Sequence, residues 1–313
     1  MVSSQASEQG FPPSTPGAGY GEAIGHHGEF LQGVFKTPEG GLRRGLLTVP
    51  HPRLKSVANF WPRTGKQIRT RPDDREKAAA AARLTLDFLG QNKVGGDLTI
   101  SSNIRFGSGL GSSTADVVAA IRATADAFGK RLSRLDLCDL AVRAETAIDA
   151  IAFGIQPVLF AHRQSGLIEA FSGDFPDLLI VGFDTGDDPI NTTEHKPARY
   201  SSDEIELFAV LRGLVSRAIT DRDTPLFCRV ATLSAQINQR HLPRARFDEI
   251  TWLAQECNAR GIQVAHSGNI AGLLFDVGNL SAALTGTRSL KHSGFGNVGV
   301  FHFPSGRELQ NHE

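Results

Sequence analysis

The sequence predicts an α+β protein that is built from two parts, and three observations support this prediction. Segments with strand patterns concentrate in the first 185 residues, whereas helical patterns dominate residues 202–260. A glycine-rich segment separates a predicted strand from a predicted helix in the first part. The length of 313 residues allows one large or two medium domains with an ample core.

Periodicity and end signals place the elements of the first part. Helices are expected where alanine-rich or amphipathic segments begin after polar residues and end at glycine. These helices cover residues 75–90, 115–129 and about 133–147. Strands are expected where residues alternate or where β-branched and apolar residues gather. These strands cover residues 45–61, 97–104, 157–162 and 177–184.

The second part follows a change of character near residues 185–200. After its helical region, a Ser-Gly-Asn turn precedes an apolar run within residues 262–277, and a helix over 278–290 and a final strand over 296–303 are expected. The first twenty residues are rich in Ser, Gly and Pro. We therefore predict a flexible tail over 1–20, a first domain over 21–190 and a second over 191–313.

Composition excludes several classes of protein. The 33 basic and 33 acidic residues give a formal net charge of zero, which argues against a dedicated nucleic-acid binder. No apolar run approaches the roughly 20 residues that a membrane helix needs. The three cysteines are far apart and form neither a disulfide framework nor a zinc pattern. We expect a cytoplasmic protein, a monomer or homodimer, whose partner is a small molecule rather than a nucleic acid or a membrane.

The most informative feature is the glycine-rich run Gly-Ser-Gly-Leu-Gly-Ser-Ser-Thr, residues 107–114. Three alternate glycines let the backbone approach an anion, and the following helix offers unpaired N–H groups. The run is not a Walker A motif because no Lys follows the glycines, and Ser112 replaces the third glycine of a dinucleotide fingerprint. A turn that merely caps a helix is the alternative, but the order of strand, glycines, serines and helix favours phosphate binding.

Two carboxylates after this loop are candidates for chemistry. Glu145 and Asp149 lie four residues apart in an apolar setting, so a continuing helix would place both on one face. Two like charges there are unfavourable unless a cation or a function stabilises them. A surface helix end with two acidic residues is the alternative. The remaining carboxylates of this region have simpler explanations, as helix-dipole partners or solvated charges: Asp116, Asp126, Asp136 and Asp139.

With these motifs, the sequence resembles the GHMP kinase superfamily. In this chain, Arg105 stands where the ATP loop of the superfamily usually has a proline. Two more segments resemble its L-threonine kinase branch, associated with cobamide side-chain synthesis. They are Gly-His-His-Gly-Glu-Phe-Leu-Gln-Gly at 25–33 and Ala-His-Ser-Gly-Asn at 265–269. The resemblance implies an N-terminal ribosomal-S5-like domain and a C-terminal ferredoxin-like domain.

The resemblance also implies roles for the candidate residues. ATP would bind loop residues Gly107, Ser108, Gly109, Leu110, Gly111, Ser112, Ser113 and Thr114. Ser113 and Glu145 would bind Mg²⁺, and Asp149 would orient the acceptor hydroxyl or accept its proton. The branch has Glu-Pro-x-Asp here, whereas this chain is one residue longer and lacks the proline. One of the two carboxylates can therefore be displaced from the family position.

The acceptor expected from the resemblance is a free hydroxy amino acid, most simply L-threonine. Glu29 suits its ammonium group, and the turn at 266–269 suits its carboxylate. The expected acceptor-binding residues are Glu29, His27, Gln32, His266, Ser267, Gly268 and Asn269. Two adjacent histidines without a third spaced ligand are a weak signal for metal.

Two alternatives stay open at this point. The first is a GHMP kinase for another acceptor, such as serine, a modified hydroxy amino acid, homoserine or a sugar. The second is a regulatory protein that binds nucleotide without catalysis. Such a protein would retain the loop and lose the carboxylates, and the presence of both Glu145 and Asp149 argues mildly against it.

Overall fold

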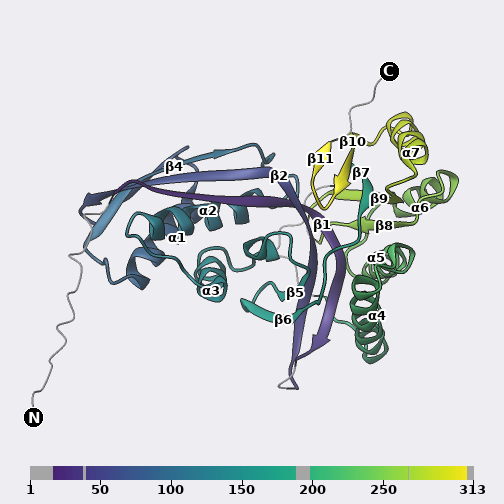
Figure 1. The fold of residues 1–313 in the computed structure, drawn as a ribbon, viewed down its shortest axis with the longest axis horizontal. Coiled ribbons are helices and arrows are strands. Elements are labelled where there is room, and N and C mark those ends of the chain that lie inside the picture. Colours follow the sequence, from purple (N-terminus) through teal and green to yellow (C-terminus); the bar gives the residue numbers. More distant parts are fainter. Residues whose placement is uncertain (1–16, 38–39, 188–197, 267, 309–313) are drawn as a thin grey trace, which may run out of the picture.

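The computed structural model describes residues 17–37, 40–187, 198–266 and 268–308, and a single twisted sheet runs through them (Figure 1). Its strands are β1 (Gly19–Lys36), β2 (Leu42–Thr64), β3 (Ile68–Arg71), β4 (Val94–Ser102), β5 (Val158–Ala161), β6 (Gly166–Ala170), β7 (Leu178–Asp184), β8 (Gly261–Val264), β9 (Ile270–Asp276), β10 (Gly296–Phe303) and β11 (Arg307–Glu308). The helices are α1 (Glu76–Phe88), α2 (Ser112–Asp126), α3 (Arg134–Glu145), α4 (Ser202–Thr220), α5 (Thr224–Asn238), α6 (Phe247–Glu256) and α7 (Leu280–His292), with a 3₁₀ turn at Ala150–Phe153.

The long antiparallel pair β1–β2 forms the middle of the sheet. The strand order is β11-β10-β7-β9-β8-β1-β2-β4-β3, and β5 and β6 branch from β2. The register of β1 against β2 shifts at three places between Ile24 and Leu31. Such bulges twist a strand and re-aim its side chains, so the register here departs from simple alternation.

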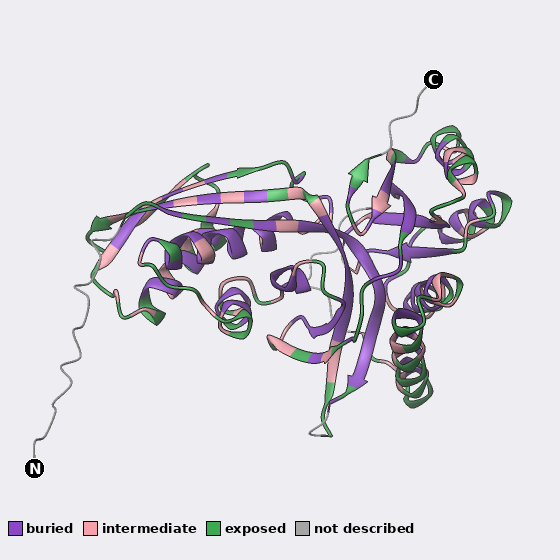
Figure 2. Ribbon diagram, viewed as in Figure 1, coloured by how far each residue is buried: buried purple, intermediate pink, exposed green. Residues whose placement is uncertain are grey.

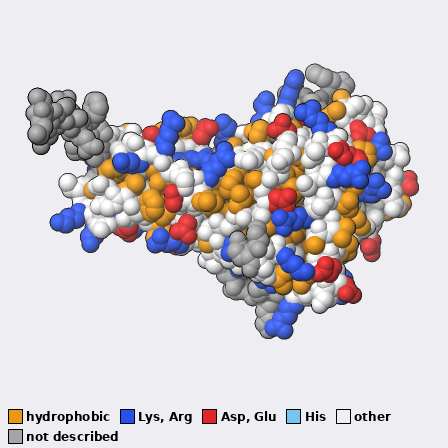
Figure 3. Space-filling model, turned by 60° about the horizontal axis from the view of Figure 1, so that its bottom comes forward, with side chains coloured by type: hydrophobic (Ala, Val, Ile, Leu, Met, Phe, Trp, Pro, Cys, Tyr) orange, Lys and Arg blue, Asp and Glu red, His pale blue; other side chains and the backbone are white. Residues whose placement is uncertain are grey.

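Helices cover the sheet in two groups. Helices α1, α2 and α3 pack beneath the β1–β2–β4 portion, and α4 to α7 lie beside the portion built from β7 to β10 (Figure 1). Buried residues concentrate along β1, β2 and the inner faces of the helices (Figure 2). On the face shown in Figure 3, basic and acidic side chains are interspersed, which accords with the balanced charge.

Small residues let α2 approach β1 closely. An added Cβ at Gly19 would lie 2.1 Å from the carbonyl oxygen of Ala123, and one at Gly21 would lie 2.3 Å from that of Ala119. Alanines fill most of the buried face of α2 for the same reason. The close approach holds α2, which follows the glycine-rich loop, against the strand that carries His26.

Most predicted elements are present, and the α+β class is confirmed. The predicted helices appear as α1 to α7, and the strand predicted at 45–61 is part of the longer β2. Strands β1, β3, β6 and β11 were absent from the sequence prediction, and β8 and β9 form the segment 262–277, which was predicted only as a turn and an apolar run. The helix expected to about residue 147 ends at Glu145, because Thr146 adopts a φ of 72°. The premise that a continuing helix carries both carboxylates is therefore wrong.

The structure differs from the predicted domain bounds at the start of the first domain and in the pairing of β7. Residues 1–16 lie outside the described residues, and β1 begins at Gly19, inside the segment expected to be a tail. Strand β7 belongs by sequence to the predicted first domain but pairs with β9 and β10 of the second. The division at 190/191 stays a prediction. Among the described residues, none of the helices combines the length and apolar character that crossing a membrane requires.

Candidate active site

The glycine-rich loop turns sharply into the N-terminus of α2. Gly107, Gly109 and Gly111 all have positive φ, between 73° and 77°, and Gly111 occupies the N-cap position. No side chain caps this helix, so its first N–H groups stay available to an anion. The backbone conformation expected of a phosphate-binding loop is thus present.

The loop packs against the turn that follows β8. An added Cβ at Gly109 would lie 2.4 Å from the Cα of Gly268, and an added Cβ at Gly268 would lie 2.3 Å from the Cα of Gly109. On its other side, Gly111 contacts the ring of His26, and the backbone N–H of His26 donates to the carbonyl of Leu110 over 3.0 Å. Three segments far apart in sequence therefore meet where the loop bends.

A pocket of about 260 Å³ opens beside this junction. Its wall combines the loop and the start of α2 with the segment after α3, the bulged part of β1 and the turn after β8. The lining residues are His26, Glu29, Leu46, Phe106, Gly107, Gly109, Gly111, Ser112, Ser113, Thr114, Glu145, Ala147, Ile148, Asp149, His162, Arg163, Ala265, His266 and Gly268. The pocket therefore joins the predicted phosphate loop to both candidate carboxylates.

Glu145 lies at the end of α3 and faces the start of α2. Its carboxylate accepts hydrogen bonds from Thr114 Oγ1 over 3.0 Å and from Lys77 Nζ over 3.1 Å, and Ser113 also bonds to it. Burial raises the pKa of this carboxyl, although the hydroxyl of Ser113 and the charge of Lys77 oppose the shift. The predicted metal ligands, Ser113 and Glu145, are thus neighbours.

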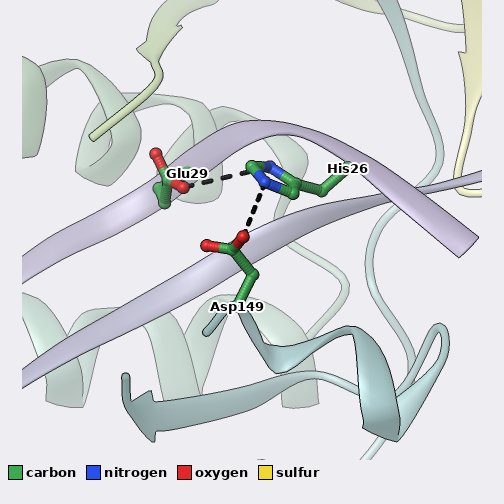
Figure 4. Close-up of side chains that lie close together, drawn as sticks. All are labelled: His26, Glu29 and Asp149. Atoms are coloured by element: carbon green, nitrogen blue, oxygen red, sulfur yellow. Dashed lines mark ion pairs between the residues drawn. The ribbon is translucent and has the colours of Figure 1, made fainter. Parts of the chain in front are cut away.

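Asp149 contacts a buried histidine instead of Glu145. Its Oδ2 lies 2.9 Å from His26 Nε2, and His26 Nδ1 lies 4.0 Å from Glu29 Oε1 (Figure 4). Imidazole nitrogen and carboxylate oxygens of these three residues all lie within 4.8 Å of one another. The strand β1 and the segment before the 3₁₀ turn contribute the members of this cluster.

The cluster shifts the pKa of each member. Burial disfavours the charged form of His26, but the attraction and hydrogen bond of Asp149 outweigh this and raise the pKa of His26 to about 9. Burial would raise the pKa of Asp149, yet the charge of His26 lowers it overall. Burial raises the pKa of Glu29 to about 8. At neutral pH, a cationic His26 therefore faces an ionised Asp149 and a largely protonated Glu29.

Glu29 links the cluster to the turn after β8. Its Oε2 accepts a hydrogen bond of 2.5 Å from the backbone N–H of His266. The ring of His266 in turn contacts Gln32, with 2.9 Å between Nδ1 and Oε1. Glu29, predicted to bind the acceptor, lies within the bulged strand β1. Gln32 contacts the ring of His266 but does not itself line the pocket.

Not every predicted residue reaches this pocket. His27 contacts Gln263 and Phe301 and lines a separate cavity of about 320 Å³, because bulged β1 directs it away from His26. Asn269 uses its carbonyl to accept from Thr185 and does not line the pocket. Ser108 and Leu110 belong to the loop without lining the pocket, whereas Gly268 lines it. Ser267 lies outside the described residues.

Several pocket residues were missed by sequence reasoning. His26, His162, Arg163 and Leu46 line the pocket but were not predicted as site residues. A signal existed only for His26, which stands in the glycine-bounded run at 25–33 that resembles the L-threonine kinase branch. The others come from strands or turns whose sequence pattern is that of ordinary core elements.

Comparison with known protein families shows which family this part of the chain is similar to. Residues 76–161 match the model of the GHMP kinases N terminal domain, a range that contains the glycine-rich loop, Glu145 and Asp149. Over this range the chain is similar to the GHMP kinases, the family that the glycine-rich loop predicts. Within the superfamily, the resemblance to the L-threonine kinase branch is also confirmed by curated relatives.

Two of these GHMP kinases are L-threonine kinases. That of Citrobacter freundii is 31% identical over 183 residues, which are 57% of this chain and 62% of the relative. That of Salmonella typhimurium is 32% identical over 183 residues, which are 56% of this chain and 59% of the relative. The matches thus span about three fifths of each relative's length.

A solved GHMP kinase structure agrees at the level of the fold. The homoserine kinase of Cytophaga hutchinsonii superposes with a TM-score of 0.61 over 96% of both chains, at 15% identity. At such low identity the likeness shows the fold alone.

Proposed function

We propose that this protein transfers the γ-phosphoryl group of ATP to the side-chain hydroxyl of a free hydroxy amino acid, with L-threonine as the first candidate. The observation that carries the proposal is the shared pocket, in which an uncapped helix N-terminus and an ionised carboxylate face the same space. The similarity to two L-threonine kinases supports the choice of acceptor.

The nucleotide phosphates belong at the loop. Phosphoryl transfer needs donors that neutralise the charge of the β- and γ-phosphates. The N–H groups of residues 107–113 and the start of α2 offer such donors, and the glycines leave no side chains in the way. Lys77 adds a positive charge beside Glu145, which lines the pocket.

The residues Ser113 and Glu145 fit a magnesium ion. A hydroxyl and a carboxylate are the hard oxygen ligands that Mg²⁺ prefers alongside phosphates and water. Glu145 is 8% exposed in its side chain, and burial raises its pKa, so a cation beside it relieves an unfavourable charge. Mg²⁺ in this position would neutralise charge on the phosphates.

The acceptor hydroxyl belongs beside Asp149. In direct in-line transfer, the hydroxyl oxygen forms a bond to the γ-phosphorus as the bond to the ADP oxygen breaks. The ionised carboxylate of Asp149 orients the hydroxyl and accepts its proton, and His26 stabilises the ionised form. Because the pKa of Asp149 is lowered, orientation is its main contribution and proton transfer occurs late, when the hydroxyl is strongly acidified.

A panel of acceptors tests this proposal. The purified protein is incubated with MgATP and threonine, serine, homoserine, galactose or mevalonate, and ADP release and product mass are measured. We expect O-phosphothreonine or another O-phosphoamino acid. ADP release with a product that is not an amino acid would support kinase activity and would rule out a hydroxy amino acid as the acceptor. Bound ATP with no ADP from any acceptor would favour the regulatory alternative.

Asp149→Asn completes the test. We expect this variant to retain ATP binding and to lose at least about 100-fold in kcat, the usual scale for acid–base groups. Asp139→Asn, at an exposed carboxylate of α3, is the matched control. Turnover of Asp149→Asn close to that of the control would rule out the role of Asp149.

A further inference from the structure

The ring of His162 lines the pocket and has no hydrogen-bond partner among the described residues. Its side chain follows β5, the residue is 4% exposed, and neither ring nitrogen is paired with any described residue. Leaving a buried polar group unpaired costs about 1–3 kcal/mol, so unpaired groups are rare in native structures. A ligand that supplies the missing partner would offset this cost.

The position of His162 relative to Asp149 is fixed by the backbone. The carbonyl of His162 accepts a 2.9 Å hydrogen bond from the N–H of Ile148, which precedes Asp149 directly. The ring lies edge-on to His266, with 5.2 Å between ring centroids. His162 therefore belongs to the same end of the pocket as the carboxylate assigned to the acceptor hydroxyl.

The ring of His162 is neutral at physiological pH. Burial, together with the nearby His266 and arginines, lowers the pKa of His162 to about 3. A neutral imidazole has one N–H donor and one lone pair, so it can form a directed hydrogen bond without bringing a charge. The surrounding charges decide whether the donor or the lone pair is used.

These surrounding charges are mainly positive. Arg163 lines the pocket, and Arg44 and Arg244 lie close enough to help lower the pKa of His266 to about 4. His26 adds a buried cation, whereas Asp149 is the ionised acid of this end and Glu29 has a pKa raised to about 8. This balance favours an anionic group on the ligand and disfavours an ammonium group beside His162.

We propose that His162 binds the acceptor by donating its ring N–H to a carboxylate, with Arg163 supplying positive charge. The proposal rests on the proposed function and refines it, because it makes hydroxy acids the preferred acceptors over neutral alcohols. It also moves the acceptor carboxylate from the turn at 266–269, where the sequence places it, to the end of β5.

The test compares two acceptors that differ in one group. L-Threoninol carries a hydroxymethyl group where L-threonine has its carboxylate, and kcat/KM is measured for both. His162→Ala removes the donor, and His162→Asn returns an N–H at a similar reach. His51→Ala is the matched control, because His51 is also buried, has an unpaired Nδ1 and lines the separate cavity that contains His27.

The expected signature is a loss of discrimination. The wild-type preference for threonine over threoninol should fall at least about tenfold in His162→Ala, return in part in His162→Asn and stay unchanged in His51→Ala. The KM for ATP should stay the same in all four proteins. Equal losses for both acceptors in His162→Ala would overturn the proposal, since they would indicate a merely structural role.

Binding separates this proposal from the kinase proposal. Calorimetry measures the affinity for L-threonine in the presence of a non-hydrolysable ATP analogue and Mg²⁺. Weaker threonine binding in His162→Ala than in His51→Ala supports the role of His162 even if no phosphoryl transfer occurs. A wild-type protein that phosphorylates galactose and binds no carboxylate overturns the role of His162 and leaves the kinase proposal standing.

Discussion

His26 and Asp149 form a buried ion pair across the candidate active site, with 2.9 Å between Nε2 and Oδ2. The two residues lie 123 positions apart, one on the bulged strand β1 and the other after α3. The pair explains how an acid can stay ionised in a site whose burial would otherwise neutralise it.

Replacing His26 should change the pH profile of the proposed kinase activity. In His26→Gln, the attraction that lowers the pKa of Asp149 is lost while its burial remains, so this pKa rises. The acid limb of the kcat profile should therefore move to higher pH, and kcat at neutral pH should fall about 10- to 100-fold. His51→Gln is the control, and an unmoved acid limb would contradict the coupling.

Buried neutral histidines should make the fold sensitive to acid. Burial lowers the pKa of His27 and His162 to about 3 and that of His51 and His266 to about 4. Below pH 6.5 the unfolded chain binds protons at these residues that the folded chain does not, so the free energy of unfolding falls by about 1.4 kcal/mol per pH unit for each.

Glu29 opposes this effect over the same pH window. Its folded pKa of about 8 lies above the unfolded value, so its contribution is fully present below about pH 4.5 and is lost as the pH rises through 8. Urea unfolding should therefore show that the free energy of unfolding is lower at pH 5 than at pH 7, by a net amount on the order of 5 kcal/mol.

In His51→Asn, the pH dependence of the free energy of unfolding should decrease by the amount that one proton contributes. A free energy of unfolding that does not change with pH would refute the assignment.

Gly109 and Gly129 allow a matched test of the loop. Both have positive φ, 77° and 64°, so alanine at either carries a backbone cost of about 1 kcal/mol. Only Gly109→Ala also places a Cβ 2.4 Å from Gly268, whereas Gly129 has open space around it. Gly109→Ala should weaken ATP binding at least tenfold and Gly129→Ala should leave it unchanged, as measured by calorimetry. Similar ATP affinities in the two variants would argue against the loop as the nucleotide site.

Glu145→Gln tests the magnesium site. The amide retains the shape of the carboxylate but loses the charge that a divalent cation needs. We expect the Mg²⁺ concentration for half-maximal activity to rise at least tenfold while the free energy of unfolding stays the same or increases, because the buried charge is removed. Asp87→Asn, on the exposed side of α1, is the control. An unchanged Mg²⁺ requirement would exclude Glu145 as a ligand.

Local patterns were sufficient to predict the helices and the loop. Alanine periodicity and terminal glycines mark α1 and α2, and the three alternate glycines mark the turn between β4 and α2. These features depend on neighbours along the chain, so the sequence states them directly. The pairing of Ser113 with Glu145 was expected from the family resemblance rather than from spacing.

The arrangement around β1 could not be predicted in this way. Bulges interrupt the alternation of β1, so the sequence pattern does not indicate that His26 lines the pocket and that the adjacent His27 lines the separate cavity. The positive φ of Thr146 likewise has no sequence signal, and it directs Asp149 toward His26 instead of along the face of α3. The role of His162 depends on contacts between distant segments.

The continuous β1–β2 pair has a mechanical consequence. Its hydrogen bonds run from Gly19 opposite Phe60 to Lys36 opposite Leu42, and the same two strands also bond to β4, β5 and β8. A continuous strand pair of this kind resists bending between the two ends of the molecule. The glycine-rich loop and the turn after β8 should therefore keep the same distance from each other while reactants bind and leave. We therefore expect reactants to enter and leave through rearrangement of side chains and loops, not by the opening of one half against the other.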